Sequence, residues 1–275
     1  MLNNMNTNLI TSESLEILRS NKTFYMSTKR PLLGFNSSYK ISKGLKKYNY
    51  TTGILYLQPS DAVSKKTLCP HAKPAGCEEP CLGKKSGRLA MLTSQKAMTR
   101  RTIQYVLDPD GFKDRLRLEI IKNETDKYCI RLNGTSDIDF SDLISSLPNI
   151  QFYDYTKVFH RVERNNLSNY HLTYSASFKT QKLINKTKEA AYKGFNIAIP
   201  LNSKGSKGDF KIPTKLIINN NLTSLNDFDV TDLRFLDKAG SIGTLTRKGS
   251  SIKQRLAEQS DPSFFGNINT LTLLA

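Results

Sequence analysis

The sequence predicts an α/β fold, a partial or irregular parallel (β/α) barrel of roughly five to seven strands, with a cysteine-rich metal loop after the first strand. Short apolar runs typical of strands alternate with helical segments along the chain, which is the pattern of βαβ units. These units recur about every 20 residues, fewer than the roughly 30 per unit of an eight-stranded barrel. A flat, doubly wound sheet is the alternative.

The first expected element is a helix over residues 12–21, which carries Leu15, Ile17 and Leu18 on one side. The apolar run 53–57 is the first expected strand, and the cysteine loop 67–87 follows it. Further helices are expected at 89–106, with Asp110 then capping one at 112–122, and at 140–147 and 180–192. Further strands are expected at 128–132, 150–155, 170–174, 195–200, 215–218 and 233–236.

The 275 residues suffice for one large domain with a full hydrophobic core. Residues 1–50 are polar and are expected to form an extension with a short helix. Residues 51–250 are the expected metal-binding core domain, within which residues 202–212 form a loop, and residues 251–275 are an expected tail.

The chain is strongly basic, with 41 Lys and Arg against 24 Asp and Glu and a formal net charge of +17. Such an excess favours polyanionic partners, and nucleic acid, either DNA or RNA, is the first of these. The alternative is a Lys- and Asn-rich composition inherited from an AT-rich genome.

No segment reaches the roughly 18 consecutive apolar residues that a membrane-spanning helix requires. Residues 1–14 lack the basic and apolar regions of a signal peptide. We therefore expect no membrane partner and a cytoplasmic location. In a reducing compartment, clustered cysteines indicate metal ligands rather than disulfides.

The cysteine loop carries Cys69, Cys77 and Cys81 with the spacing C-x7-C-x3-C. Thiolates are soft ligands that suit zinc or an iron–sulfur cluster. Three of them can hold a 4Fe–4S cubane with one iron open, whereas addition of His71 would close a tetrahedral zinc site. The alternative is three buried small side chains. Cys129 lies within a strand, where packing is its expected role and ligation the alternative.

A second candidate site lies where polar residues follow the strands. The strand 128–132 runs directly into Gly134 and its polar neighbours, and ligands of parallel α/β proteins bind at the carboxyl ends of strands. We expect Gly134 to let a ligand approach the backbone. An ordinary turn with Asp137 as a helix cap is the alternative. The candidate cofactor-binding residues are Asn133, Gly134, Thr135, Ser136, Asp137, Asp154, Lys157 and Ser175, and Asp232, Arg234 and Asp237 flank the last expected strand.

Basic residues gather on the helix that follows the cysteine loop. The candidates for phosphate contact are Arg88, Lys96, Arg100 and Arg101. The alternative is a solvated helix face.

Six blocks of the sequence, in the same order, resemble the bacteriophage gene product eighty-eight family. The blocks lie at residues 69–81, 87–102, 131–137, 151–157, 170–175 and 232–237. This resemblance implies a phage or mobile-element origin.

The layout also resembles the radical S-adenosylmethionine enzymes, in which a three-cysteine loop follows the first strand and a glycine motif follows the second. Those enzymes usually carry C-x3-C-x2-C, so this chain differs in its spacing. The resemblance implies an iron–sulfur enzyme that uses S-adenosylmethionine, and the charge adds nucleic acid or a nucleotide as the expected substrate. The alternative is a zinc-stabilised nucleic-acid-binding protein without catalytic activity.

Overall fold

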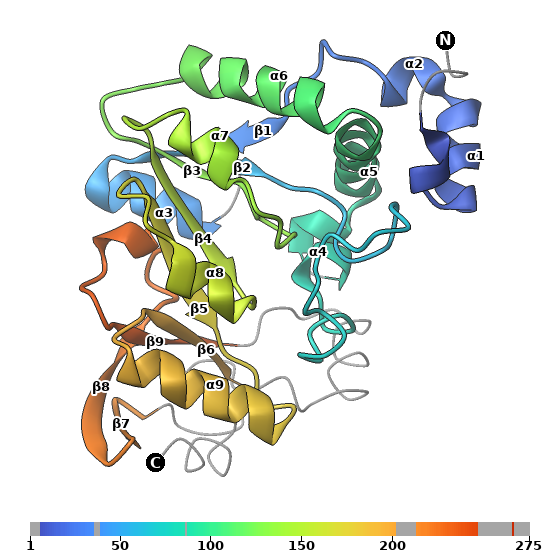
Figure 1. Ribbon diagram of the computed structural model, residues 1–275. Coiled ribbons are helices and arrows are strands. Elements are labelled where there is room, and N and C mark those ends of the chain that lie inside the picture. Colours follow the sequence, from blue (N-terminus) through green and yellow to red (C-terminus); the bar gives the residue numbers. More distant parts are fainter. Residues whose placement is uncertain (1–5, 36–38, 86, 202–212, 247–265, 267–275) are drawn as a thin grey trace.

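The computed structural model describes residues 6–35, 39–85, 87–201, 213–246 and 266. A nine-stranded sheet lies at its centre, with the strand order β1-β2-β3-β4-β5-β6-β9-β8-β7 (Figure 1). The strands are β1 (Leu33–Phe35), β2 (Thr51–Leu55), β3 (Tyr128–Arg131), β4 (Gln151–Thr156), β5 (Tyr170–Ser175), β6 (Ile197–Leu201), β7 (Lys215–Ile218), β8 (Asn221–Asp227) and β9 (Ile242–Thr246).

The sheet is mostly parallel and follows the order of the chain. Each neighbouring pair from β2 to β6 is parallel, and β9 continues the parallel series beside β6. Strand β8 also runs parallel to β9, whereas β1 and β7 pair antiparallel with β2 and β8. The prediction of a parallel α/β sheet is confirmed. The predicted barrel is not, because β1 and β7 leave the sheet open at its two edges.

The expected strands at 128–132, 150–155, 170–174 and 195–200 are confirmed as β3 to β6. The strand expected at 233–236 is wrong, since Arg234–Leu236 form the 3-10 helix η4. The Arg234 guanidinium finds its partners locally, since it donates a hydrogen bond to the carbonyl of Thr231 and forms an ion pair with Asp237. Charged groups that find partners so close in sequence compete with strand pairing.

The last parallel strand of the sheet is instead β9, which the sequence analysis missed. It contains only two large aliphatic residues and is interrupted by Gly243, so it lacks the apolar run on which strand prediction depends. The segment 215–218 does form a strand, but it lies in the antiparallel hairpin of β7 and β8.

The expected helices at 12–21, 89–106, 112–122, 140–147 and 180–192 all form, with shifts of a few residues at their ends. Asp108, rather than Asp110, caps α6, because its carboxylate accepts a hydrogen bond from the Gly111 amide at 3.0 Å. The helices are α1 (Ser12–Ser20), α2 (Lys22–Tyr25), α3 (Tyr39–Tyr48), α4 (Leu82–Lys85), α5 (Leu92–Leu107), α6 (Pro109–Lys122), α7 (Ser141–Ser145), α8 (Phe159–Arg164) and α9 (Gln181–Tyr192), with short 3-10 turns η1 (Thr7–Leu9) and η2 (Gly87–Ala90).

The main hydrophobic core lies between one face of the sheet and helices α6 to α9. Alternate residues of each strand, such as Phe152 on β4 and Leu172 on β5, point into this layer. Helix α6 contributes Phe112, Leu116 and Ile120, whose spacing of four places them on one side of the helix. This layer fixes the strands firmly enough that the loops at their carboxyl ends have defined positions.

The opposite face of the sheet carries a smaller and more polar layer. Cys129 and Tyr153 point from β3 and β4 into a cluster with Leu233 and Phe235 of the segment after β8. Cys129 is fully buried there and its thiol contacts the Thr52 hydroxyl at 3.3 Å. This location agrees with the packing role expected for Cys129.

Replacement of Gly243 by Ala should destabilise the fold. A Cβ atom at this position would lie 2.1 Å from Cδ1 of Phe228. The Phe228 ring is buried and covered by the Arg234 guanidinium, centred 3.8 Å from the ring, so it cannot easily move away. Overpacking of this kind costs about 1–3 kcal/mol of the free energy of unfolding, which chemical denaturation would measure.

The matched control is Gly243→Ala combined with Phe228→Leu, compared with Phe228→Leu alone. The added methyl group should cost less once the ring is gone, because the clashing atoms are absent. Equal costs of Gly243→Ala in the two backgrounds would contradict this account of how β9 packs.

Candidate functional site

A cavity of about 360 Å³ lies at the carboxyl ends of the parallel strands. Its wall includes Ile54 of β2, Tyr155 of β4, Ser175 of β5, Pro200 of β6 and Leu245 of β9. The strands run in the same direction, so the loops that follow them meet at one edge of the sheet. This is where parallel α/β proteins bind their ligands.

The cysteine loop, residues 67–81, forms one wall of this cavity. Cys69, Cys77, Cys81 and His71 all line it. The loop follows β2 and is held to the turn after β3, because the Asp137 amide donates to the carbonyl of Leu68 at 2.9 Å. The structure therefore brings the four predicted metal ligands to the same cavity.

The three thiols are half-buried, and all four cysteines of the chain are free. Burial raises the pKa of each of the three, that of Cys69 to about 12. The Ser60 amide, which donates to the Cys69 sulfur at 3.4 Å, acts to lower the pKa of Cys69, whereas the charges of Cys81, Asp137 and Cys77 act to raise it.

Among the residues that the structure describes, no group of three or more His, Cys, Asp or Glu is arranged to hold a metal ion. The chemistry of the donors nevertheless fits a soft metal, since three free thiols and an imidazole line one cavity. Metal binding would therefore require the loop to draw its ligands together.

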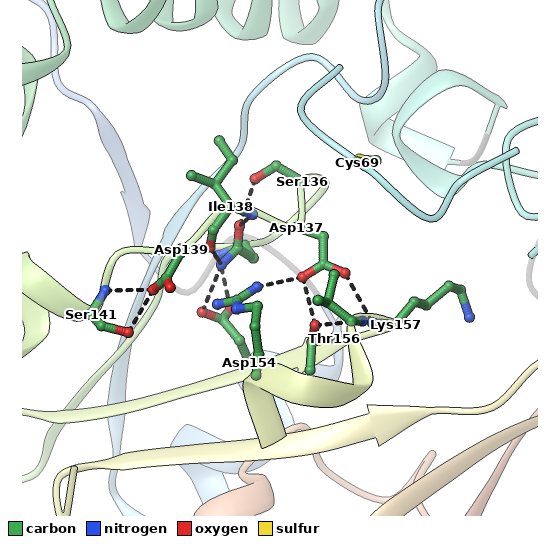
Figure 2. A network of polar contacts seen from close by, with 12 residues as sticks. Cys69, Ser136, Asp137, Ile138, Asp139, Ser141, Asp154, Thr156 and Lys157 are labelled. Carbon is green, nitrogen blue, oxygen red and sulfur yellow. Dashed lines mark hydrogen bonds and ion pairs between the residues drawn. The ribbon is translucent and has the colours of Figure 1, made fainter. Parts of the chain in front are cut away.

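The turn from Asn133 to Asp137 is held by its own side chains (Figure 2). The amide oxygen of Asn133 accepts hydrogen bonds from the Ser136 hydroxyl at 3.0 Å and from the Ile138 amide at 2.8 Å. The Thr135 hydroxyl donates to the carbonyl of Leu57 at 2.5 Å. The turn thus reaches the cavity with its polar groups already fixed.

Asp137 connects this turn to the next strand, as Figure 2 shows. One carboxylate oxygen accepts hydrogen bonds from the Thr156 hydroxyl and the Arg161 guanidinium, and the other accepts from the Lys157 amide at 2.9 Å. With both of its oxygens engaged, Asp137 positions the turn against β4 and α8. The alternative in which Asp137 caps a helix is therefore not what the structure has, since its carboxylate bonds to β4, to the Lys157 amide and to α8.

Asp154 lies beneath the turn rather than in the cavity wall, and its side chain is fully buried. It accepts hydrogen bonds from the Asn133 amide at 2.8 Å and from the Tyr170 hydroxyl at 3.1 Å. Burial raises its pKa to about 6, although the charge of Arg131 acts in the opposite direction. Asp154 supports the turn from below, so a direct contact with a cofactor would require it to leave these partners.

Gly134 is required at its position by packing of the turn against β2. A Cβ atom there would lie 2.7 Å from both Ile54 and Tyr56, and 2.8 Å from the carbonyl oxygen of Leu55. The Gly134 amide donates to that same carbonyl at 3.0 Å. The close approach is therefore made by the protein's own strand, whereas the sequence analysis expected it to be made by a ligand.

Lys157 and Ser175 extend the cavity wall beyond the turn. The Lys157 ammonium donates to the Ser175 hydroxyl at 3.0 Å and to the carbonyls of Ser175 and Ala176, each at 3.2 Å. Burial lowers the pKa of Lys157, while the charges of Cys77 and Asp137 act to raise it. The structure thus places a fixed amino group beside the cysteine loop.

The four basic residues predicted to contact phosphate fall into two groups. Arg88 and Lys96 are exposed on η2 and α5. Arg100 is only 2% exposed, and its guanidinium donates to the carbonyls of Pro31 at 2.7 Å and Ser27 at 3.4 Å. Burial also lowers its pKa, to about 10. The prediction for Arg100 is wrong, because this side chain holds the segment before β1 in place.

Arg101 is half-buried, and its guanidinium contacts the carbonyl of Tyr56 at 3.5 Å. It faces the end of β2 rather than solvent, so it is also poorly placed to contact a phosphate. Burial of this kind depends on which segment packs against α5, and the helical periodicity alone does not reveal it.

The structure adds cavity residues that the sequence analysis did not predict, namely Lys40, Arg131 and Tyr155. They surround Asp232, which the sequence had only indicated as a flanking residue. Arg131 lies between apolar residues at the end of β3, whereas Tyr155 lies between Asp154 and Thr156 of β4. Polar residues inside buried strands are the feature that could have identified both. Lys40 has no such distinguishing feature in the sequence, because it is one of several lysines in helix α3.

These features define an α/β protein with a cavity at the carboxyl ends of an open parallel sheet. The chain belongs to the gene product 88 family, whose family model matches residues 26–260. The predicted resemblance to this phage family is confirmed. No curated protein and no solved structure matches the chain. None of the described helices is both long and apolar enough to cross a membrane.

Replacement of Arg161 by Met should strongly destabilise the protein. The ion pair of Arg161 with Asp137 is nearly buried, with side-chain exposures of 7% and 11%. Removal of one partner leaves a buried carboxylate with less compensation, which costs about 3–5 kcal/mol of the free energy of unfolding. Urea denaturation of the variant measures this loss.

Arg117→Met is the matched control, because Arg117 pairs with Asp114 at side-chain exposures of 36% and 67%. An exposed pair of this kind is worth less than about 1 kcal/mol. Similar losses in the two variants would show that the Arg161–Asp137 pair has no special role in holding the turn.

Proposed function

We propose that this phage-family protein is an iron–sulfur enzyme of radical S-adenosylmethionine-like type that acts on nucleic acid or a nucleotide. The observation that carries the proposal is that Cys69, Cys77 and Cys81 line the same cavity as the carboxyl ends of the parallel strands. They belong to one loop, which directly follows the first parallel strand.

The donor set suits a 4Fe–4S cubane, for which cysteine thiolates are the usual ligands. Three cysteines leave one iron without a protein ligand, and this iron would supply the coordination site for S-adenosylmethionine or a substrate. The cavity wall also contains the buried apolar side chain of Ile54, and apolar surface of this kind would favour exclusion of water from a reactive centre.

Several residues of this chain would support such a centre. The Lys157 ammonium is anchored on the end of β5 beside Cys77, where its charge would offset that of thiolate ligands. The Asn133–Asp137 turn is fixed in advance by Asp137 and Arg161. Ser136 and Lys157 remain candidate cofactor contacts because they line the cavity.

The size of the cavity bears on the substrate. About 360 Å³ is enough for a small molecule or a single nucleotide, whereas a duplex is far too wide. A nucleic-acid substrate would therefore present one nucleotide to the cavity. The net charge of +17 and the exposed Arg88 and Lys96 near the cysteine loop favour a polyanion as the larger partner.

A zinc-stabilised nucleic-acid-binding protein is the second candidate, and His71 is the observation that favours it. Its side chain lines the cavity together with the three thiols. A Cys3His set would close the coordination sphere of zinc and serve only a structural purpose. In that case the metal would fix the loop, and the basic residues would hold the nucleic acid.

Metal analysis of wild type and His71→Ala separates the two candidates. After anaerobic purification, the iron–sulfur proposal predicts a brown protein with about four iron atoms per chain. His71→Ala should keep this iron content and its melting temperature, since the three cysteines suffice as ligands. Elemental analysis, the visible spectrum and thermal denaturation provide the readouts.

Cys81→Ala is the positive control, because loss of one thiol should lower the iron content sharply. A colourless wild type that holds one zinc, with loss of that zinc and a lower melting temperature in His71→Ala, would overturn the enzyme proposal in favour of the zinc site.

Nucleic-acid binding should depend steeply on salt. For single strands, the slope of log Kobs against log salt is about −0.7 per phosphate contact. Combined replacement of Arg88 and Lys96 by Ala removes two contacts and should therefore flatten the slope by about 1.4. Fluorescence anisotropy of a labelled single-stranded oligonucleotide, measured across a salt series, provides the slope.

Arg117→Ala, which removes an exposed arginine of α6, is the matched control and should leave the slope unchanged. An affinity that does not vary with salt in the wild type would remove nucleic acid as the reason for the basic charge.

A further inference from the structure

A second part of the cavity wall is charged rather than thiol-rich. We name it the charged wall and define it as Lys40, Arg131, Tyr155, Asp232 and Thr246, all of which line the cavity. These residues come from α3, β3, β4, the segment after β8, and β9. Convergence of five separate elements on one wall makes it a built feature of the fold.

Asp232 is the central residue of the charged wall and is only 5% exposed. One carboxylate oxygen accepts a hydrogen bond from the Arg131 guanidinium at 2.8 Å, and the other accepts from the Tyr155 hydroxyl at 3.2 Å. Burial raises its pKa, but the charges of Arg131 and Lys40 outweigh burial, so that its net pKa lies below the usual value. Asp232 is thus an oriented carboxylate that faces the cavity.

Lys40 links Asp232 to a second carboxylate. Its ammonium lies 3.9 Å from Asp232 and 3.3 Å from Asp229. Asp229 in turn accepts hydrogen bonds from the amide and the hydroxyl of Thr246, at 2.8 and 2.5 Å. The wall therefore presents a donor and an acceptor within 4 Å of each other, both held by neighbouring groups.

The charges of this wall indicate what it can bind. Arg131 and Lys40 balance Asp232 and Asp229, so a phosphate would meet two carboxylates and a cation would meet two basic groups. A buried set of ion pairs also stabilises a protein no better than apolar packing does, which makes a binding role the better explanation. The suitable ligand is a neutral group that both donates and accepts hydrogen bonds.

We propose that the charged wall binds the vicinal hydroxyls of a ribose, so that the cavity takes a ribonucleoside or a derivative of one. A hydroxyl can donate to Asp232 and accept from Lys40, and two adjacent hydroxyls can use both contacts. A carboxylate holds the ribose hydroxyl in the same way in dinucleotide-binding folds. Ile54, Pro200 and Leu245 supply apolar surface for the rest of the ligand.

This inference deepens the proposed function, since it takes the same cavity as the site and narrows its ligand. It requires no metal, because the residues of the charged wall are not among the predicted metal ligands. The ribose inference and the iron–sulfur proposal can therefore fail independently of each other.

The test compares ligands that differ only in the hydroxyls. Isothermal titration calorimetry of the full chain would measure binding of adenosine, guanosine, cytidine and uridine, and of their 2′,3′-dideoxy counterparts. At least one ribonucleoside should bind, and its dideoxy form should bind at least about tenfold more weakly, because buried polar groups would be left without partners. Equal affinities, or no binding of any ribonucleoside, would overturn the inference.

Asp232→Asn tests the residue itself. It should weaken binding of the ribonucleoside by about tenfold and leave the dideoxy form unaffected, since only the former contacts the carboxylate. Asp142→Asn removes an exposed carboxylate of α7 and is the matched control. If Asp232→Asn does not fold, the comparison of ligands on the wild type still decides the question.

Metal content measured on the same samples keeps the two proposals distinct. Normal iron with no discrimination between ribose and dideoxyribose would overturn this inference alone. Discrimination in a protein that binds no iron would overturn the iron–sulfur proposal alone.

Discussion

The candidate site depends above all on the buried carboxylate of Asp137. Its oxygens join Arg161 of α8, Thr156 of β4 and the backbone of Lys157, while its amide joins the cysteine loop at Leu68. One residue thus holds together the turn, the neighbouring strand and the loop that carries the thiols. A carboxylate with so many partners is costly to disturb, and this cost keeps the turn in place against β4 and α8.

Much of the fold could be predicted from the sequence, because strands β3 to β6 are apolar runs bounded by turns and the longer helices α5, α6 and α9 carry helical periodicity. The six-residue helix α8 is too short to show such a pattern and was not predicted. Strands β2 to β6 lie in the order of the chain, as short connections favour neighbouring positions for consecutive strands. Strand β9 could not be predicted, since it gains its place by pairing with β6 and not by its own composition. Segment 233–236 was mistaken for a strand because Leu233 and Phe235 alternate with charged residues.

Sequence reasoning can single out candidate site residues that lie close together in the chain, but not those that come together from distant segments. The thiols and the Asn133–Asp137 turn are compact motifs, and the structure brings both to one cavity. The charged wall is assembled from distant segments, so no window of sequence contains it. The burial of Arg100 could not be predicted for the same reason. Its guanidinium is buried only because residues 27–31 pack against α5 and accept its hydrogen bonds.

The order of the strands has a consequence for biosynthesis. The sheet follows the chain from β2 to β6, and β9 is added last. On the ribosome, the cysteine loop therefore emerges long before Leu245 and Thr246, which complete the wall of the cavity. The nascent chain exposes its thiols to the surrounding solution for the time needed to translate about 160 residues, which at roughly 5–20 residues per second is about ten to thirty seconds. Insertion of a metal before the cavity closes is a route that this topology leaves open.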